Sequence, residues 1–298
     1  ECEAAIAGGV NVIIHPTLHI AFSKAGMLSE DGKCKSFDKD ANGYVRGEGA
    51  GAVYLKPLSR ALADGDYIHG LIKGSTVNHG GKANSLTAPN PTAQAELLIR
   101  AYDDAEIDPR SISYIEAHGT GTSLGDPVEI NGLKKAFVTQ YKKWGYPPPI
   151  EPHCGIGSVK TNIGHLETAA GIAGVLKVLF AMKHKKLPAI LNFNESNPYI
   201  QLEGSPFYLV EKTVDWNNGP NGMPRIAGIS SFGFGGANAH IIIEEYSPEK
   251  LEEPEEVSQQ VVVLSAKNGE RLKVYAENLK DYLLQNQNIN LRNLAYTL

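Results

Sequence analysis

Two stretches of this sequence share one pattern: a short apolar segment, a loop of small and polar residues, and then a helical segment. In the first, residues 111–118 favour a strand, 119–125 form the loop, and a helix opens at Asp126. In the second, 154–160 favour a strand and 166–184 a helix. Alternating strands and helices are typical of α/β folds, in which helices cover a largely buried sheet. The chain is therefore predicted to be an α/β protein.

The rest of the chain supplies further elements of both kinds. Apolar, β-branched segments predict a buried strand over 4–14 and later strands over 51–58, 67–77, 205–210, 225–232 and 239–245. A helix is predicted over 90–105, with Asn90 as its N-cap and Pro91 in its first turn. Asp126 and Glu129 have the spacing of a capping box for the helix that follows. Three consecutive prolines predict a loop over 140–153.

A change of composition near residue 246 predicts the domain organisation. Residues 1–245 form the main domain, and 246–260 carry five glutamates and two prolines, as a solvated linker does. Beyond the linker, 261–266 favour a strand and 269–285 an amphipathic helix, so 261–298 are predicted to begin a small appended α/β unit. The chain opens without Met and stops within a helical pattern, and we expect it to be a piece of a larger protein.

Composition excludes several classes of function. The formal net charge of −5 provides no basic footprint for nucleic acid, and no apolar run is long enough to span a bilayer. The start does not resemble a signal peptide. Three widely spaced cysteines, an odd number, favour a reduced, cytoplasmic protein.

The sequence does not support a nucleotide or metal site. A P-loop needs Gly before its Lys, but Val159 precedes Lys160. The glycines of "HGTGTSLG" are spaced one residue too widely for a dinucleotide fingerprint. The nine histidines and three cysteines show no spacing typical of metal ligands. No bound metal is therefore predicted.

His118 and His165 are the strongest candidates for chemistry. Each follows a predicted strand and lies in a loop that leads into a helix, which is where α/β sheets collect ligands. The partial positive charge of a helix N-terminus would keep His165 neutral. A neutral imidazole can donate one hydrogen bond to an oxygen that gains negative charge. Lys160 would add fixed positive charge or orient the loop through a carboxylate.

Four long segments carry a resemblance to a known family. The segments "EAHGTGTSLGDPVE" (116–129) and "GSVKTNIGHLETAAGIAGVLK" (157–177) resemble the two histidine motifs of β-ketoacyl synthases. "FDKDANGYVRGEGAGAVYLKPLSRALADGD" (37–66) and "GISSFGFGGANAHIIIEE" (228–245) resemble the same family. The resemblance is strongest to ketosynthases of modular polyketide synthases, including those served by a separate acyltransferase. It covers residues 1–245, and 261–298 resemble the start of the post-ketosynthase linker.

The resemblance implies a thiolase-like layered fold and a Cys-His-His site for decarboxylative Claisen condensation. An acyl chain moves from acyl carrier protein to the Cys, malonyl carrier protein loses CO2, and the enolate attacks the thioester. It implies substrates carried on phosphopantetheine, no bound cofactor, and a homodimer.

The same resemblance assigns roles to individual residues. His118 and His165 would stabilise the enolate. Lys160 would pair with a carboxylate at Glu129, which competes with the capping-box interpretation of that residue. Asn162 lies between this lysine and His165 and is expected to support them. The remaining residues contact substrate: Thr120 and Thr122 would bind the phosphopantetheine arm, and Phe234, between Gly233 and Gly235, would act as a gate whose backbone N–H stabilises the thioester oxyanion.

The family's nucleophile has no counterpart in this chain. Cys2 lies between two glutamates, which would raise its pKa, and Cys154 enters a predicted buried strand. Cys34 lies between two lysines but in a polar loop without a shielded pocket. Three hypotheses follow: the C-terminal part of an active ketosynthase that needs its N-terminal part as partner, a non-catalytic scaffold that docks carrier protein, or a malonyl-thioester decarboxylase without condensation.

Overall fold

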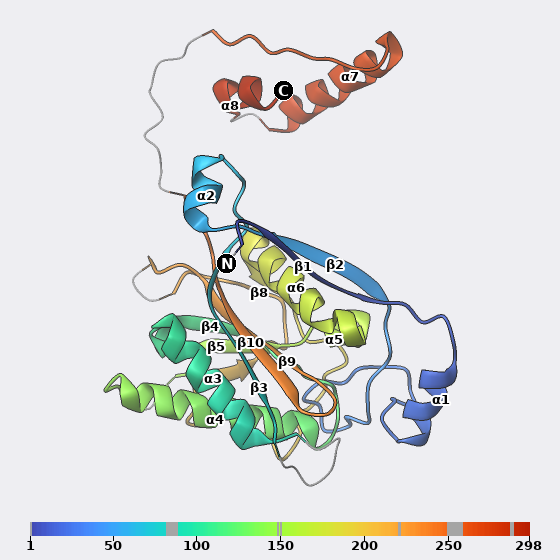
Figure 1. Cartoon of the computed structure of the whole chain (residues 1–298), viewed down its shortest axis with the longest axis vertical. Coiled ribbons are helices and arrows are strands. Elements are labelled where there is room, and N and C mark those ends of the chain that lie inside the picture. Colours follow the sequence, from blue (N-terminus) through green and yellow to red (C-terminus); the bar gives the residue numbers. More distant parts are fainter. Residues whose placement is uncertain are drawn as a thin grey trace. The chain divides into compact units, whose positions relative to one another are not determined.

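A six-stranded mixed sheet organises the computed structural model, within the described residues 2–81, 89–147, 149, 151–219, 222–248, 259–286 and 289–298 (Figure 1). Its strand order is β3-β10-β9-β4-β5-β7. The strands are β3 (Leu71–His79), β10 (Ala237–Glu244), β9 (Ile226–Phe232), β4 (Ile112–Glu116), β5 (Cys154–Gly157) and β7 (Phe207–Leu209). The β3–β10 and β10–β9 pairs are antiparallel, and the β9–β4, β4–β5 and β5–β7 pairs are parallel. The α/β prediction is therefore confirmed, with a mixed sheet at the centre.

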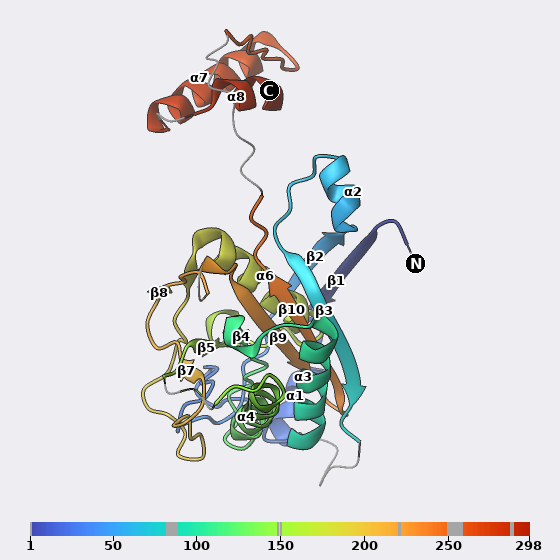
Figure 2. The same cartoon turned by 90° about the vertical axis from the view of Figure 1, so that its left-hand side faces the viewer.

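Helices cover both faces of this sheet (Figures 1 and 2). On one face lie α3 (Pro91–Ala105) and α4 (Gly125–Lys143), which pack against each other, and on the other lies α6 (Ala170–His184). Two buried clusters fill the spaces between these layers. Ile115 of β4 joins Leu98 and Leu133 on the first face, whereas its neighbour Tyr114 joins Val178 of α6 on the second. Successive side chains of β4 thus serve opposite cores, as a strand buried on both faces requires.

A second, two-stranded ribbon lies against α6. It pairs β1 (Ala5–Asn11) with β2 (Gly49–Leu55) in antiparallel register. A Cβ at Gly9 would lie 2.7 Å from the Thr168 carbonyl oxygen, so only glycine allows this approach. The other side of the ribbon is uncovered, with Ile6 78% and Val10 58% exposed. The prediction of a buried strand over 4–14 is therefore wrong about burial, because within the described part of the chain this ribbon has a packing partner on one face only.

Shorter elements complete residues 1–247. The helices are α1 (Thr17–Lys24), α2 (Leu58–Ala63) and α5 (Lys160–Ile163), and the 3-10 helices are η1 (Pro109–Ser111) and η2 (Glu167–Ala169). A small pair joins β6 (Lys186–Leu187) to β8 (Val214–Asp215). The predicted cap is confirmed, since the Asn90 side chain accepts hydrogen bonds from Thr92 N and Ala93 N. The predicted loop over 140–153 starts late, because α4 runs to Lys143 before the prolines begin; Pro148 lies outside the described residues.

Residues 248–298 form a separate compact unit. It holds α7 (Gly269–Gln285), capped by Asn268, and α8 (Leu291–Thr297), capped by Asn290. The described residues of this unit contain no strand: 261–266 have no regular secondary structure, and Val261 is 81% exposed. The strand predicted over 261–266 is therefore not formed here, because a strand needs a neighbour to pair with, and the assignment of 261–298 to the start of an appended α/β unit stays a prediction. Of the predicted acidic linker 246–260, residues 249–258 lie outside the described residues.

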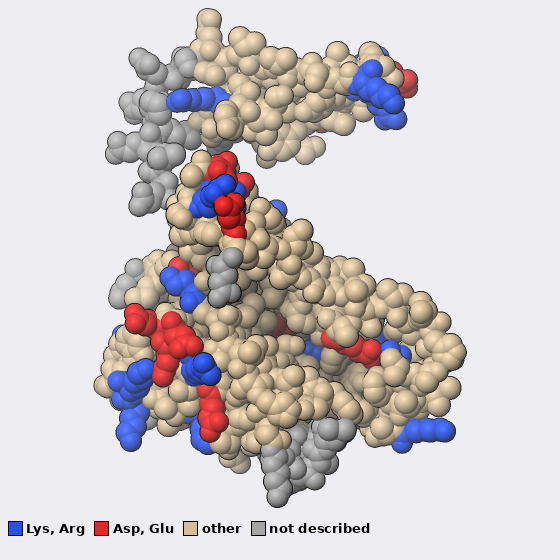
Figure 3. All heavy atoms as spheres, in the orientation of Figure 1, with Lys and Arg blue, Asp and Glu red and all other residues tan. Residues whose placement is uncertain are grey.

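Charged side chains of both signs alternate on the face of the first unit shown in Figure 3, near α3 and α4. Arg100 and Asp104 are an i,i+4 pair on α3, and Lys143 pairs with Asp103 at 2.7 Å. These exposed pairs are typical of a solvated face. No helix among the described residues has the length and apolar character needed to cross a bilayer.

Candidate active site

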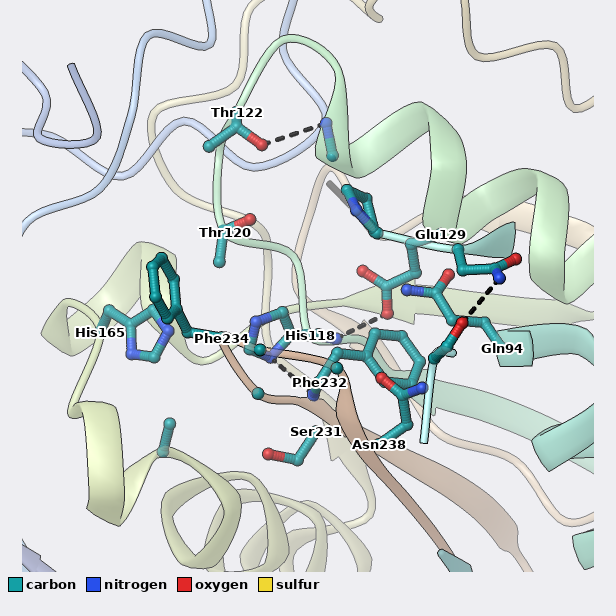
Figure 4. A pocket seen from close by; sticks show the side chains of 18 of the residues that line it. Gln94, His118, Thr120, Thr122, Glu129, His165, Ser231, Phe232, Phe234 and Asn238 are labelled. Atoms are coloured by element: carbon teal, nitrogen blue, oxygen red, sulfur yellow. Dashed lines mark hydrogen bonds between the residues drawn. The ribbon is translucent and has the colours of Figure 1, made fainter. Parts of the chain in front are cut away.

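Two neighbouring parallel strands deliver the two histidines to one place. β4 ends at Glu116, and His118 lies in the loop that connects it to α4. β5 ends at Gly157, and His165 lies in the segment between it and α6. Parallel strands end at the same edge of a sheet, so both loops meet there. The two imidazole rings are nearly perpendicular, with centroids 5.5 Å apart (Figure 4).

In each imidazole, one ring nitrogen accepts a hydrogen bond from a backbone N–H. His118 Nδ1 accepts from Phe232 N at 3.3 Å, and His165 Nδ1 accepts from Glu167 N at 2.8 Å. In a neutral imidazole one nitrogen accepts and the other carries the proton. Both rings are therefore held with the proton on Nε2, and both Nε2–H groups remain able to donate.

The environment keeps both rings uncharged. Burial, followed by the charges of Lys160 and His165, holds the pKa of His118 well below its ordinary value. Burial and the charge of Lys160 lower the pKa of His165 to about 3. Burial disfavours the charged form of a base, and a nearby cation adds to that effect. Around neutral pH, both histidines are hydrogen-bond donors rather than cations.

Two buried charges hold the His118 loop by its backbone. The Glu129 carboxylate accepts from His118 N at 2.7 Å and from Gly119 N at 2.8 Å, and Lys160 Nζ donates to the His118 carbonyl oxygen. Both side chains are nearly inaccessible, with 4% of each residue exposed. The loop can turn so tightly because Gly119 has φ +43°, and a Cβ there would lie 2.8 Å from Ser158 Cβ.

These contacts correct the two predictions made for Glu129. No side chain caps α4, whose N-cap is Leu124, so the capping box is not formed. Asp126 instead accepts from Phe37 N and Gly121 N, and thus ties the loop to an earlier segment. Within the described part of the chain, Lys160 makes no ion pair with Glu129, although their charges interact. Burial raises the pKa of Glu129 to about 7, and its two backbone donors oppose that rise.

The segment 44–47 cradles His165. His165 N donates to the Val45 carbonyl oxygen at 2.7 Å, and Gly47 N donates to the His165 carbonyl oxygen at 2.9 Å. The Tyr44 ring packs on the imidazole with centroids 5.0 Å apart. His165 is therefore fixed on both sides of its backbone and on one side of its ring.

A cavity of about 650 Å³ opens onto both imidazoles (Figure 4). All of the residues predicted to contact substrate line it: Thr120, Thr122, Gly233, Phe234 and Gly235. The Thr122 hydroxyl also accepts from Gly125 N at 3.1 Å, which is ordinary turn chemistry. Asn162 lies on α5 with an exposed side chain and does not line the cavity.

Phe234 lies in the turn between β9 and β10. The turn is closed by hydrogen bonds from Gly233 N to the Ala237 oxygen and from Gly236 N to the Gly233 oxygen. The Phe234 side chain is 61% exposed, and among the described residues its backbone N–H has no acceptor. Within that part of the chain, the N–H is free to donate to a ligand oxygen.

None of the three cysteines, all of which lie in the described residues, lines this cavity. Cys2 is exposed, whereas Cys34 and Cys154 are buried. Burial raises the pKa of both buried thiols. The described residues contain no group of three or more His, Cys, Asp or Glu side chains that could hold a metal ion.

Several contributors to the site were not among the predicted residues. Phe232 acts through its backbone N–H, which leaves no signal in a sequence. Tyr44, Arg46 and Glu167 surround His165, and the last two are charged residues of the motifs that carry the family resemblance. Glu116 accepts from Val159 N at 2.5 Å and pairs with Lys177 at 2.8 Å, so it joins the end of β4 to the Lys160 segment.

Comparison with known proteins places these features in a family. The model of the β-ketoacyl synthase N-terminal domain matches residues 1–61, that of the C-terminal domain 69–194, and that of the ketoacyl-synthetase C-terminal extension 196–298. Polyketide synthases PksN and PksL of Bacillus subtilis (strain 168) are 54% and 50% identical over the whole chain, which covers 6% and 7% of their lengths.

Solved structures give the same result. The ketosynthase from module 6 of the bacillaene synthase from Bacillus subtilis 168 is 46% identical, with a TM-score of 0.84 over 99% of this chain and 50% of that one. The oxazolomycin ketosynthase domain OzmH KS7 of Streptomyces albus is 41% identical, with a TM-score of 0.85. The thiolase-like fold is confirmed, and the chain spans about half the length of these ketosynthases. The two histidine loops, the cavity and these likenesses agree, and the chain belongs to the β-ketoacyl synthase family, with its relatives among the ketosynthases of polyketide synthases.

Proposed function

We propose that this chain supplies the decarboxylating half of a polyketide synthase ketosynthase. A malonyl thioester on acyl carrier protein enters the cavity, and its terminal C–C bond breaks to release CO2. The electron pair becomes the enolate of the acetyl thioester. The enolate carbon then forms a new C–C bond with the carbonyl carbon of an acyl thioester, and the cysteine thiolate leaves.

The pair of Nε2–H donors is the observation that carries this proposal. The enolate oxygen gains negative charge as CO2 leaves, and two neutral imidazoles can share it. His118 and His165 present rings 5.5 Å apart, each with Nδ1 already engaged. A charged imidazole would bind the malonyl carboxylate and stabilise the state before the reaction, so the lowered pKa of each ring favours the transition state instead.

The other residues have supporting roles in this proposal. Lys160 and Glu129 hold the His118 loop, and the Lys160 charge adds to the burial that keeps both imidazoles neutral. The Phe234 N–H would stabilise the oxyanion of the acyl thioester, with Gly233 and Gly235 giving the turn its freedom. Thr120 and Thr122 would bind the phosphopantetheine arm that carries the substrate. No bound cofactor is required.

The nucleophile would come from a ketosynthase N-terminal part, which we propose as a partner together with acyl carrier protein. The uncovered face of the β1–β2 ribbon supports this partner, because the exposed apolar side chains of β1, Ile6 and Val10, would be buried against it. We also propose a homodimer, as in the family. The free thiols are compatible with a reduced, cytoplasmic setting.

Decarboxylation without condensation is the second candidate. It is favoured by one observation: no cysteine of this chain lines the cavity that contains both histidines. The two candidates differ in what they need. Condensation requires the N-terminal part, whereas CO2 release requires the histidines alone.

Both candidates are tested by mixing the chain with malonyl carrier protein and measuring CO2 and condensed product, with and without a ketosynthase N-terminal part. Product only in the presence of that part supports the first candidate, and CO2 without it supports the second. His118→Ala and His165→Ala are each expected to lower the rate of CO2 release by about 10²–10³-fold. His184→Ala, at the exposed end of α6, is the matched control. Undiminished release by both active-site variants would contradict the proposal.

A further inference from the structure

Arg46 is a buried cation next to, but outside, the residues that the proposed function uses. Only 8% of it is exposed. Its guanidinium forms a bidentate ion pair with Glu167, in which Nε donates to Oε1 at 2.5 Å and Nη2 donates to Oε2 at 2.9 Å. Nη1 contacts His19 Nδ1 at 2.8 Å, and the guanidinium lies over the Phe22 ring. A bidentate pair fixes the orientation of both side chains in addition to stabilising their charges.

Glu167 has an unusual backbone. Its φ is +45°, in the left-handed region that non-glycine residues rarely occupy. Its backbone N–H points toward the ring two positions earlier and donates to His165 Nδ1 at 2.8 Å. A strained backbone of this kind persists where surrounding contacts hold it in place. The side chain of Glu167 is held by the Arg46 guanidinium.

Arg46 and Glu167 lie in segments whose backbones form hydrogen bonds with His165. Arg46 forms an isolated parallel bridge with His165, through the Val45 oxygen on one side and the Gly47 N–H on the other. The backbone of 45–47 therefore fixes the histidine's main chain, and the side chain of Arg46 fixes the residue that engages its ring.

We propose that Arg46 and Glu167 are positioning residues that hold His165 in the Nε2–H tautomer. The tautomer of an imidazole is set by the hydrogen bond at its other nitrogen. With Arg46 in place, the Glu167 carboxylate is fully engaged, and the backbone N–H alone faces Nδ1. Without Arg46, that carboxylate is free, two residues from the ring, to accept from Nδ1–H and draw the proton there. Nε2 would then be an acceptor facing the enolate oxygen.

The catalytic meaning of this pair rests on the proposed function, but the tautomer can be measured without turnover. The nitrogen-15 NMR shifts of the His165 ring in the chain separate the protonated nitrogen from the unprotonated one. In the wild-type chain and in Glu167→Gln, Nε2 is expected to carry the proton. In Arg46→Met the proton is expected to move to Nδ1, with CO2 release about 10–100-fold slower.

The double variant Arg46→Met/Glu167→Gln gives the sharpest result. It removes the Glu167 carboxylate, which has no partner once Arg46 is replaced, but keeps the backbone N–H of residue 167. The Nε2–H tautomer should therefore return, and the rate of CO2 release should recover to within about threefold of wild type. A purely structural ion pair would instead show no rescue, since neither partner restores the other. Arg60→Met, which removes an exposed arginine of α2 paired with Asp64, is the matched control.

Two results would overturn the inference: an unchanged Nε2–H tautomer in a folded Arg46→Met chain, or a double variant whose tautomer stays on Nδ1. If Arg46→Met does not fold, the double variant and Glu167→Gln decide, and an Nδ1–H ring in either overturns it. A wild-type chain that shows the predicted tautomer shifts, but releases no CO2 and forms no product even with a ketosynthase N-terminal part, would contradict the proposed function and support the positioning roles.

Discussion

The two histidine loops occupy equivalent places after neighbouring strands, yet they are held in different ways. The His118 loop is held from the protein interior by buried charges on its backbone, Glu129 and Lys160. The His165 loop is held from outside the sheet by the segment 44–47. The ring partners differ as well: His118 Nδ1 accepts from an N–H 114 residues away, and His165 Nδ1 from one only two residues away.

This difference shows that one chemical state can be reached through two kinds of support. Both rings end up neutral with Nε2–H. The His118 loop depends on buried polar groups, whose loss leaves other buried groups unsatisfied. The His165 loop depends on local backbone geometry and one ion pair. Loss of a supporting residue of the His118 loop should therefore lower the free energy of unfolding. Loss of a supporting residue of the His165 loop should instead change the orientation of the imidazole.

The largest effect is expected when the buried carboxylate that holds the His118 loop is removed. Glu129→Ala leaves the N–H groups of His118 and Gly119 without acceptors, and should lower the free energy of unfolding by about 2–6 kcal/mol. Denaturant unfolding measures this. Glu129→Gln keeps one carbonyl acceptor and should lose about half as much. A loss below about 1 kcal/mol for the alanine variant would mean that the loop is not held in this way.

The pH dependence of stability sharpens the comparison. Folding lowers the pKa of His165 from 6.5 to about 3. Between these two pH values, the imidazole is protonated in the unfolded chain but not in the folded chain. Its contribution to stability is therefore lost as pH falls below 6.5, at up to about 1.4 kcal/mol per pH unit. His165→Gln should flatten the acid side of the stability curve by this amount.

Glu129 should act with the opposite sign. Its pKa rises from 4.5 to about 7, so the folded chain holds the extra proton and stability falls as pH rises through that range. Glu129→Gln should therefore make the fall toward acid steeper, not flatter. Equal slopes for wild type and both variants, from urea titrations at several pH values, would show that neither group titrates differently on folding.

The smallest expected effect concerns Asn162, which the family resemblance placed in support of the site. Its side chain is exposed on α5 and does not line the cavity. Asn162→Ala should change the free energy of unfolding by no more than about 0.5 kcal/mol and CO2 release by less than about twofold. A tenfold slower release with unchanged stability would instead show that Asn162 contacts the substrate.

Sequence patterns predicted the strand–loop–helix units well, because apolar periodicity is a local signal. The same patterns placed His118 and His165 at one sheet edge, since parallel strands end together. They failed for Glu129, where the spacing of a capping box coincides with a carboxylate that reaches the His118 loop instead. They also failed for burial of Ile6 and Val10, because periodicity does not say how many faces are covered.

What could not be predicted is mostly backbone chemistry. The Phe232 N–H contacts His118 only because β9 lies next to β4 in the sheet, and strand order is not written in local sequence. The left-handed conformation of Glu167 gives no residue-type signal either. The charged residues Arg46 and Glu167 were visible in the motifs, but their pairing required the fold.

The placement of β9 beside β4 also matters during synthesis. A ribosome delivers the His118 loop more than a hundred residues before the strand that gives its ring a partner. Until β9 has emerged and joined the sheet, that imidazole lacks the backbone donor to its Nδ1. A nascent chain therefore acquires its reactive geometry late, and a truncated product ending before residue 226 would carry both histidines but not the arrangement that makes them useful.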